Sequence, residues 1–185
     1  DIMNPSGWEL LSFLMDPRSG LGYYKGYRIS NYLLMIDLIQ YCRVMPAEHI
    51  LQLPDVAERV NRYYSQEKEY QKMIKDNSVI EDNVLIINLL DVDNIKVGNR
   101  FKEYAMFPEQ DISLRIFWGR NKEKIVFSCG HSILNRSSQT NVGKLMLKYG
   151  GGGHTRVGTC QVNAEDYETV REELITAMKE TSLMV

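Results

Sequence analysis

A run of four glycines, Gly150 to Gly153, is the feature that most constrains how this chain can fold. Glycine loses more backbone entropy on ordering than any other residue, so an ordered run needs a compensating reason. One reason is close approach of bare backbone to a ligand, because successive N–H groups without Cβ atoms can form a concave nest for an anion. His154 ends the run and Arg156 follows, and both side chains can donate to an oxyanion. The alternative is a flexible turn between a helix and a strand, and both interpretations stay open at this point.

Two common phosphate-binding motifs do not fit this region. The Walker sequence requires Gly-Lys followed by Ser or Thr, but Gly143-Lys144 is followed by Leu145. The dinucleotide sequence G-x-G-x-x-G, read from Gly150, needs glycine where Thr155 stands. Both motifs also place their glycines before a helix, whereas this run follows a segment with helical periodicity. An anion here would therefore be held by N–H groups and side chains, without help from the dipole of the preceding helix.

The composition is that of an ordinary globular chain. Of 185 residues, 44% are hydrophobic and 25% are charged, and the net charge of −2 predicts no broad attraction to nucleic acid or anionic membrane. The three cysteines stand far apart without a C-x-x-C pair, which favours a reducing, cytoplasmic location over a disulfide scaffold. No apolar run reaches membrane-spanning length, so no membrane partner is expected. Because the chain begins at Asp1, we expect a segment cut from something longer, with a processed start as the alternative.

Hydrophobic patterning divides the chain into a helical segment at 1–54, a connector helix at 55–77 and a domain at 78–185. The helix after Ser30 is apolar on nearly every side, so we expect it to be buried. The connector helix has apolar residues at three- and four-residue steps and a charged opposite face. Tyrosines interleaved with basic residues at 23–28 suit stacking on nucleic acid or, more commonly, packing against a neighbouring element.

The fold class expected for the C-terminal part is α/β, with a small mixed β-sheet flanked by helices. Short apolar or alternating runs predict the strands, and capping residues predict the helix starts. The expected strands are 84–90, 112–118, 124–128 and 157–162. The expected helices are 99–107, one that Thr140 or Asn141 caps and that leads into the glycines, and a last one capped by Asn163.

Several anion-binding side chains fall close together in this domain. His131 and His154 both follow predicted elements, and Arg136 lies between them. A single histidine in a loop is more often a hydrogen-bonded structural residue than a catalyst. Two histidines, Arg136, Arg156 and a glycine run within positions 130–156 favour convergence on one anion.

Together these residues resemble a known family. An Arg-Ser pair (Arg136-Ser137), a helix from Val142 to Leu147, Gly-Gly-Gly-His ending at His154, and the strand start Val157-Gly158 resemble the C-terminal, DHH-associated domain of the DHH phosphoesterases. The segments 130–136 and 145–149 are similar to the branch called exopolyphosphatase-related. The resemblance covers roughly 79–180, and residues 1–45 resemble the tail of that family's first domain.

The resemblance implies a hydrolase of phosphate esters or anhydrides with two lobes. The first lobe would hold two Mn or Mg ions through Asp and His, and the second would grip the substrate. This chain has no His-His pair, so we expect no catalytic residue, metal ligand or cofactor within it and assign the metals to a missing N-terminal DHH domain. The implied partners are that domain and polyphosphate, an oligonucleotide or a nucleotide, and homodimerisation stays open.

The implied substrate contacts are Arg136 and His154, with the backbone of Gly150, Gly151, Gly152 and Gly153 as the nest. His131 and Ser137 are further candidates, His131 as a residue that orients either the substrate or only its loop, and Arg156 is a weaker one. The alternative function is a non-catalytic module that binds nucleotides or nucleic-acid ends.

Overall fold

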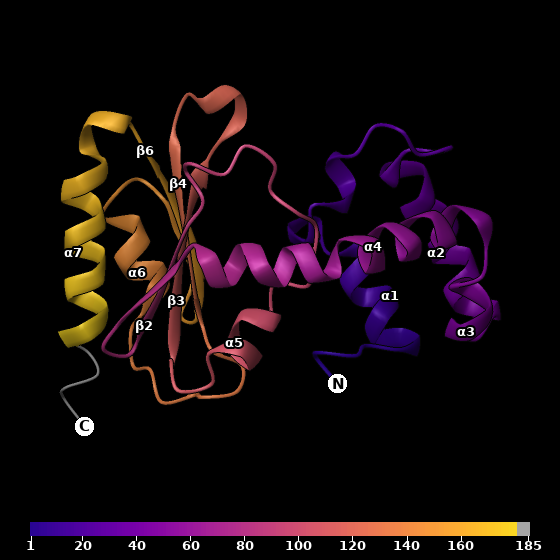
Figure 1. The fold of residues 1–185 in the computed structure, drawn as a ribbon, viewed down its shortest axis with the longest axis horizontal. Coiled ribbons are helices and arrows are strands. Elements are labelled where there is room, and N and C mark those ends of the chain that lie inside the picture. Colours follow the sequence, from indigo (N-terminus) through magenta and orange to yellow (C-terminus); the bar gives the residue numbers. More distant parts are fainter. Residues whose placement is uncertain (181–185) are drawn as a thin grey trace. The chain divides into compact units, whose positions relative to one another are not determined.

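The computed structural model describes residues 1–180, which form two compact units (Figure 1). The first unit contains Asp1–Met73 and Asn94–Lys102, and the second contains Ile74–Asp93 and the chain from Glu103 onward. Residues 94–102 join the first unit through specific bonds, such as the Gly98 N–H donating to the Ser19 carbonyl at 3.0 Å. The sequence did not indicate this return of the chain.

The first unit is built from helices α1 (Gly7–Met15), α2 (Asn31–Val44), α3 (Ala47–Ile50) and most of α4 (Pro54–Asp76), with 3-10 turns at Pro17–Ser19 and Leu21–Tyr23. Its core is a cluster of buried apolar side chains that all of these helices supply. Ser30 caps α2 as expected, because its side chain accepts a hydrogen bond from the Leu33 N–H.

Helix α2 differs from the expectation that it is buried. Only Leu34 and Leu38 are buried on it. Its other face exposes large apolar side chains, with Tyr32 at 74% and Ile39 at 62% exposure. The prediction that α2 is buried on every side was therefore wrong. A helix that is apolar all round needs packing partners, and residues 1–180 provide them for one face only.

Helix α4 confirms the predicted amphipathic pattern, since Val56, Tyr63 and Tyr70 are all buried. It also carries Arg59, whose side chain is fully buried in the first unit. The guanidinium donates to Asn31 Oδ1 at 2.8 Å and to the Ile29 and Asp55 carbonyls at 2.9 and 2.6 Å. It also stacks 3.9 Å from the ring centroid of Tyr27, so it holds the tyrosine-rich loop in place.

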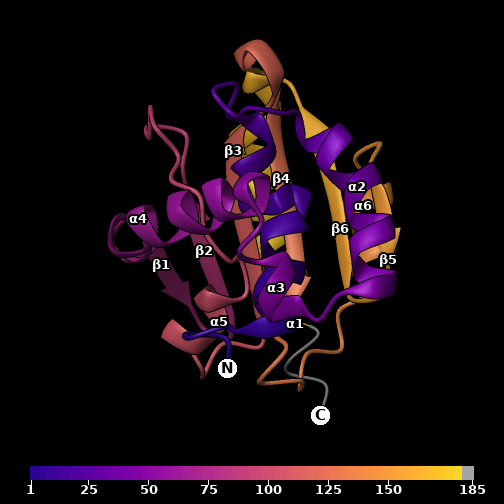
Figure 2. The ribbon, with the colours of Figure 1, turned by 90° about the vertical axis from the view of Figure 1, so that its right-hand side faces the viewer.

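The second unit contains a 6-stranded mixed sheet in the order β1-β2-β3-β4-β6-β5, which Figure 2 shows across the view. The strands are β1 (Ser78–Glu81), β2 (Val84–Asn88), β3 (Ile112–Trp118), β4 (Ile125–His131), β5 (Gly152–His154) and β6 (Val157–Val162). Strands β2 and β3 are parallel, and every other neighbouring pair is antiparallel.

Two helices cover one face of this sheet (Figure 1). They are α6 (Val142–Leu147) and α7 (Tyr167–Glu180), and they share one buried apolar cluster with β2, β3, β4 and β6. The short helix α5 (Lys102–Met106) lies on the other side, which we call the open face; there the hydroxyl of Tyr104 is 2.9 Å from that of Ser113. The α/β fold class with a small mixed sheet flanked by helices is confirmed.

Some element bounds differ from the sequence predictions. Strand β4 continues to His131, so residues 129–131, expected to leave the sheet, belong to it. Strands β1 and β5 were not predicted, and the helix expected at 99–107 is shortened to Lys102–Met106. Asn141 caps α6 by accepting from the Lys144 N–H, whereas Asn163 precedes a 3-10 turn and its side chain makes no cap bond.

Candidate phosphate-binding site

The glycine run leads from helix α6 into an edge hairpin formed by β5 and β6. His154 pairs with Val157, so Thr155 and Arg156 form its two-residue turn. The Val142 N–H donates to the Thr155 carbonyl and the His131 N–H to the Arg156 carbonyl, each at 2.9 Å. The turn is therefore pinned between the start of α6 and the end of β4, which makes it an ordered feature.

Two of the four glycine N–H groups are already used by the helix. Gly150 adopts a left-handed φ of 72° and ends α6, and its N–H donates to the Leu147 carbonyl at 3.2 Å. The Gly151 N–H donates to the Met146 carbonyl at 3.0 Å. An anion nest that uses all four N–H groups is therefore not available, and the other two glycines, Gly152 and Gly153, belong to β5 and pair with β6.

Close packing accounts for Gly151 and Gly153. A Cβ at Gly151 would lie 2.1 Å from the Thr159 carbonyl oxygen, and one at Gly153, where φ is 155°, would lie 2.2 Å from that of Val157. Gly152 differs, because a Cβ there would meet nothing within 4 Å. The packing of this chain explains glycine at the first two positions and leaves Gly152 without a structural reason.

His131 and His154 lie on opposite faces of the sheet. His131 follows the buried Phe127 and Cys129 in alternation and therefore faces α6 and α7. Its Nε2 donates to the Thr140 carbonyl at 2.8 Å, so it fixes the loop that leads into α6. His154 pairs with Val157 and is exposed on the open face. Sequence proximity thus grouped two side chains that the sheet separates.

The loop after β4 is organised by Asp111, a residue that the sequence analysis missed. Its buried carboxylate accepts from Ser137 Oγ at 2.9 Å and from Asn83 Nδ2 at 2.8 Å, and its carbonyl accepts from the Ser132 N–H at 2.7 Å. An acid directly before an apolar strand gave no signal in the sequence. Ser137 is therefore a structural donor that positions its neighbour Arg136.

Arg136 itself is exposed in this loop. Its Nε donates to the Ile133 carbonyl at 3.1 Å, and its terminal nitrogens make no hydrogen bond or ion pair with residues 1–180. Because Ser137 binds Asp111 beside the start of β3, Arg136 lies at the sheet end where β4 finishes and the β5–β6 turn begins. These connections place Arg136 and His154 at the same end of the sheet.

A buried polar network on the open face was also missed. Glu103 of α5 accepts from Ser113 Oγ at 2.7 Å and forms an ion pair with Arg115. Alternation along β3 puts Ser113 and Arg115 on one face, which is the signal that could have found the pair. Tyr149, which directly precedes the four glycines, donates to Glu173 at 2.7 Å. Burial together with this carboxylate raises the pKa of Tyr149 to about 12.

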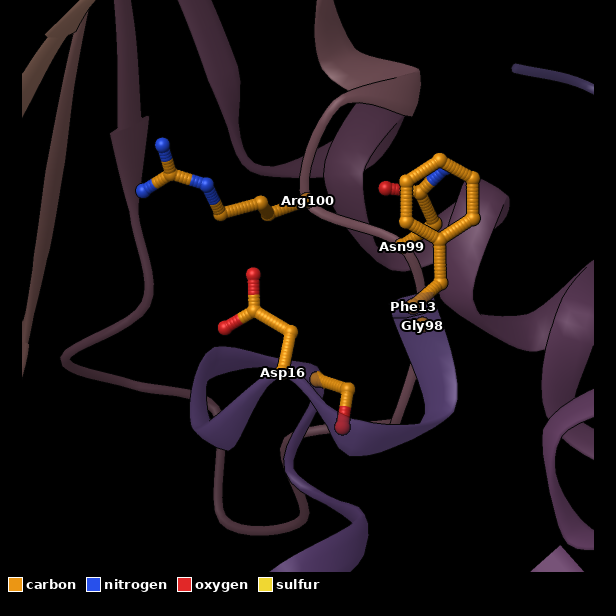
Figure 3. Close-up of a pocket in the computed structure, with 6 residues that line it drawn as sticks. Phe13, Asp16, Gly98, Asn99 and Arg100 are labelled. Carbon is orange, nitrogen blue, oxygen red and sulfur yellow. The ribbon is translucent and has the colours of Figure 1, made fainter. Parts of the chain in front are cut away.

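The first unit holds a separate small pocket (Figure 3). Phe13, Asp16, Asn99 and Arg100 line it, and the Asp16 carboxylate and Arg100 guanidinium face the same space. Burial alone would raise the pKa of Asp16, but hydrogen bonds from Arg18 and the charges of Arg18 and Arg100 hold it below its usual value. The positive charges of Arg18 and Arg100 compensate the carboxylate of Asp16, so we interpret this pocket as structural.

Within the part of the chain that the structure describes, no group of three or more His, Cys, Asp or Glu side chains is placed to hold a metal ion. Across the same residues, no helix combines the length and apolar character that crossing a membrane requires. The three cysteines are unpaired, with Cys42 exposed and Cys129 and Cys160 buried.

Comparison with solved structures identifies a relative. A pGpG-specific phosphodiesterase, PggH from Vibrio cholerae, is 46% identical with a TM-score of 0.85, over 97% of this chain and 61% of that protein. The chain therefore spans less than two thirds of that relative's length. No protein-family model and no curated protein matches the chain.

Two further structures are more distant. An exopolyphosphatase-related protein from Bacteroides fragilis has 14% identity and a TM-score of 0.45, over 83% of this chain and 44% of that one. An uncharacterized protein from Helicobacter pylori has 11% identity and a TM-score of 0.35, over 90% of this chain and 49% of that one. These two similarities are too weak to indicate a function for the chain. The 46% identity to a phosphodiesterase is the finding that counts, and it confirms the resemblance of this chain to the DHH-family phosphoesterases.

Proposed function

We propose that this chain is the substrate-binding part of a DHH-family phosphodiesterase that acts on a short linear dinucleotide of the pGpG type. The observation that carries the proposal is 46% identity to a pGpG-specific phosphodiesterase over 97% of the chain. A dinucleotide is a narrower substrate class than the polyphosphate, oligonucleotide or nucleotide that the motifs alone allow.

In this proposal the phosphate lies at the sheet end where the β5–β6 turn meets the loop after β4. Arg136 would contribute a charge-assisted contact and His154 a second donor, both from exposed side chains. Gly152 supports this role because the space around it is open, so the backbone can be approached closely. His131, Ser137 and the two helix-capping glycines would act by holding these elements.

The catalytic metals belong to another part of the proposed protein. Mn or Mg would activate water and clamp phosphoryl oxygens when bound. The described residues of this chain do not fit such a centre, because they contain no group of three or more metal-ligating side chains. The role proposed for this chain is to bind and orient the substrate.

We further propose that the metal-binding lobe packs against the exposed apolar face of α2. Support comes from Tyr32, Leu33, Met35, Ile36 and Ile39, which are 46–74% exposed. Contiguous exposed apolar side chains usually mark an interaction surface. In the longer relative, 39% of the length has no counterpart in this chain, which is room for such a lobe.

Isothermal titration of pGpG into the chain tests the proposed function. We expect Arg136→Ala to weaken binding by about 10- to 100-fold, as for the loss of a charge-assisted contact of roughly 1.5–3 kcal/mol. Arg156→Ala is the matched control at the neighbouring turn, and its effect should be smaller. Equal losses in the two variants would mean that Arg136 is the wrong arginine, and absence of binding by the unmodified chain would contradict the proposal.

A further inference from the structure

The open face of β6 presents a lane of exposed polar side chains beside the proposed phosphate site. Along this strand the buried Gly158, Cys160 and Val162 face α6 and α7, so Thr159 and Gln161 point to the open face and are exposed. Residues two apart on one face are separated by about 6.7 Å. The lane therefore runs away from His154 in two steps, first to Thr159 and then to Gln161.

The strand register shows what flanks these two side chains. Thr159 lies directly between Ser128 of β4 and Gly152 of β5. Gln161 lies opposite Val126, which in turn pairs with Phe117 of β3. Since directly opposed residues share a face, the lane changes from hydroxyls and bare backbone near His154 to an amide farther on, beside the buried Val126 and the partly exposed Phe117.

These polar groups are available to a ligand. Within residues 1–180, the side chains of Ser128, Thr159 and Gln161 make no hydrogen bond or ion pair, although each has donors and acceptors. Arg115 lies in the same row as Ser128 and differs, because Glu103 holds it through an ion pair. The lane is thus neutral next to the charged end formed by Arg136 and His154.

A neutral lane that combines an amide and hydroxyls with apolar contact has the chemistry of a nucleobase site. A base requires donors and acceptors for its edge and apolar surface for its faces, and a glutamine amide can pair with a base edge in a bidentate way.

We propose that this lane, formed by Ser128, Thr159, Gln161 and Phe117, binds one base of the dinucleotide whose phosphate lies at the β5–β6 turn. The assignment rests on the proposed function and adds residues that set base specificity. Thr159 and Gln161 read the edge of the base, while the partly exposed Phe117 contacts its plane. Gly152 keeps the entrance to the lane free of side chains.

The test is a binding titration of the chain with three ligands. They are pGpG, pApA, and ribose 5-phosphate, which keeps a phosphate but has no base. The variants are Thr159→Val and Gln161→Ala, both at exposed positions. The matched control is Thr169→Val, an exposed threonine on α7, which packs on the opposite face.

We expect Thr159→Val and Gln161→Ala each to lower the affinity for pGpG by about 5- to 10-fold. Each variant should also have a smaller ratio of pGpG affinity to pApA affinity than the unmodified chain. Ribose 5-phosphate should bind both variants as it binds the unmodified chain, and Thr169→Val should change nothing. Unchanged pGpG affinity in both variants, or equal losses for pGpG and ribose 5-phosphate, would overturn the base lane while leaving the phosphate site intact. If the unmodified chain binds no pGpG, the proposed function fails together with the lane.

Discussion

Substituting alanine for each of two adjacent glycines separates the packing role of the glycine run from its ligand role. At Gly153 a Cβ would lie 2.2 Å from the Val157 carbonyl oxygen and 2.4 Å from the Gly158 Cα, at a φ of 155°. Both contacts are with backbone, so relief requires the β5–β6 ladder to move by about 1 Å. At Gly152 the same methyl group would meet nothing within 4 Å.

The magnitudes follow from these contacts. Overpacking costs about 1–3 kcal/mol and an unfavourable backbone conformation a similar amount, so we expect Gly153→Ala to lower the free energy of unfolding by about 2–6 kcal/mol. Gly152 has no positive φ, so Gly152→Ala should stay within about 0.5 kcal/mol of the unmodified chain. Urea denaturation followed by circular dichroism measures both changes.

Binding then distinguishes the two interpretations of Gly152. If bare backbone there is approached by a ligand, the folded Gly152→Ala variant should lose at least about tenfold in pGpG affinity, since its methyl group occupies the ligand's space. Wild-type binding by this variant would mean that the run serves only as a helix cap and hairpin. Equal stability of the two variants would refute the packing argument itself.

Four other predictions concern the rest of the chain. Arg59→Met removes three hydrogen bonds from a fully buried guanidinium, and we expect a loss of about 3 kcal/mol or more in unfolding free energy; a loss below about 1 kcal/mol would contradict its role in the tyrosine loop. Burial raises the pKa of Cys160 to about 11 and also raises that of Cys129, so at pH 8 a thiol reagent should label Cys42 first and the other two only on unfolding. The pKa values of these two thiols are higher in the folded chain than in the unfolded chain. The stability that the two thiols contribute is therefore full below about pH 8.5 and is lost as pH rises toward 11. Melting temperatures measured across that pH range would show this loss. The chain alone should not hydrolyse pGpG with added Mn; chelator-sensitive turnover that survives repurification would contradict this.

The sequence predicted those parts of the fold that local rules determine. The apolar spacing of α4, the caps at Ser30 and Asn141 and the alternation in β3 and β6 each follow from backbone periodicity or from a local hydrogen bond. These features need no knowledge of distant residues.

What the sequence could not predict depends on contacts across the fold. The short strands β1 and β5 form only because β2 and β6 pair with them, and glycine has little strand preference of its own. His131 was grouped with His154 because the two are near in sequence, but sheet alternation and the extension of β4 separate them. Asp111 and Glu103 were missed because a buried acid is recognised by its partners, which come from other elements.

The most direct test of the account is a titration of the ¹⁵N-labelled chain with pGpG, followed by NMR. We expect the largest shifts at the amides of Gly152, Gly153, His154 and Arg136, with smaller shifts at Thr159 and Gln161, because a dinucleotide held at the β5–β6 turn would lie along the open face. Residues of α7, on the opposite face, should not move. Saturable binding that shifts only the first unit, or shifts α7 instead of the turn, would contradict the claim that this end of the sheet holds the substrate.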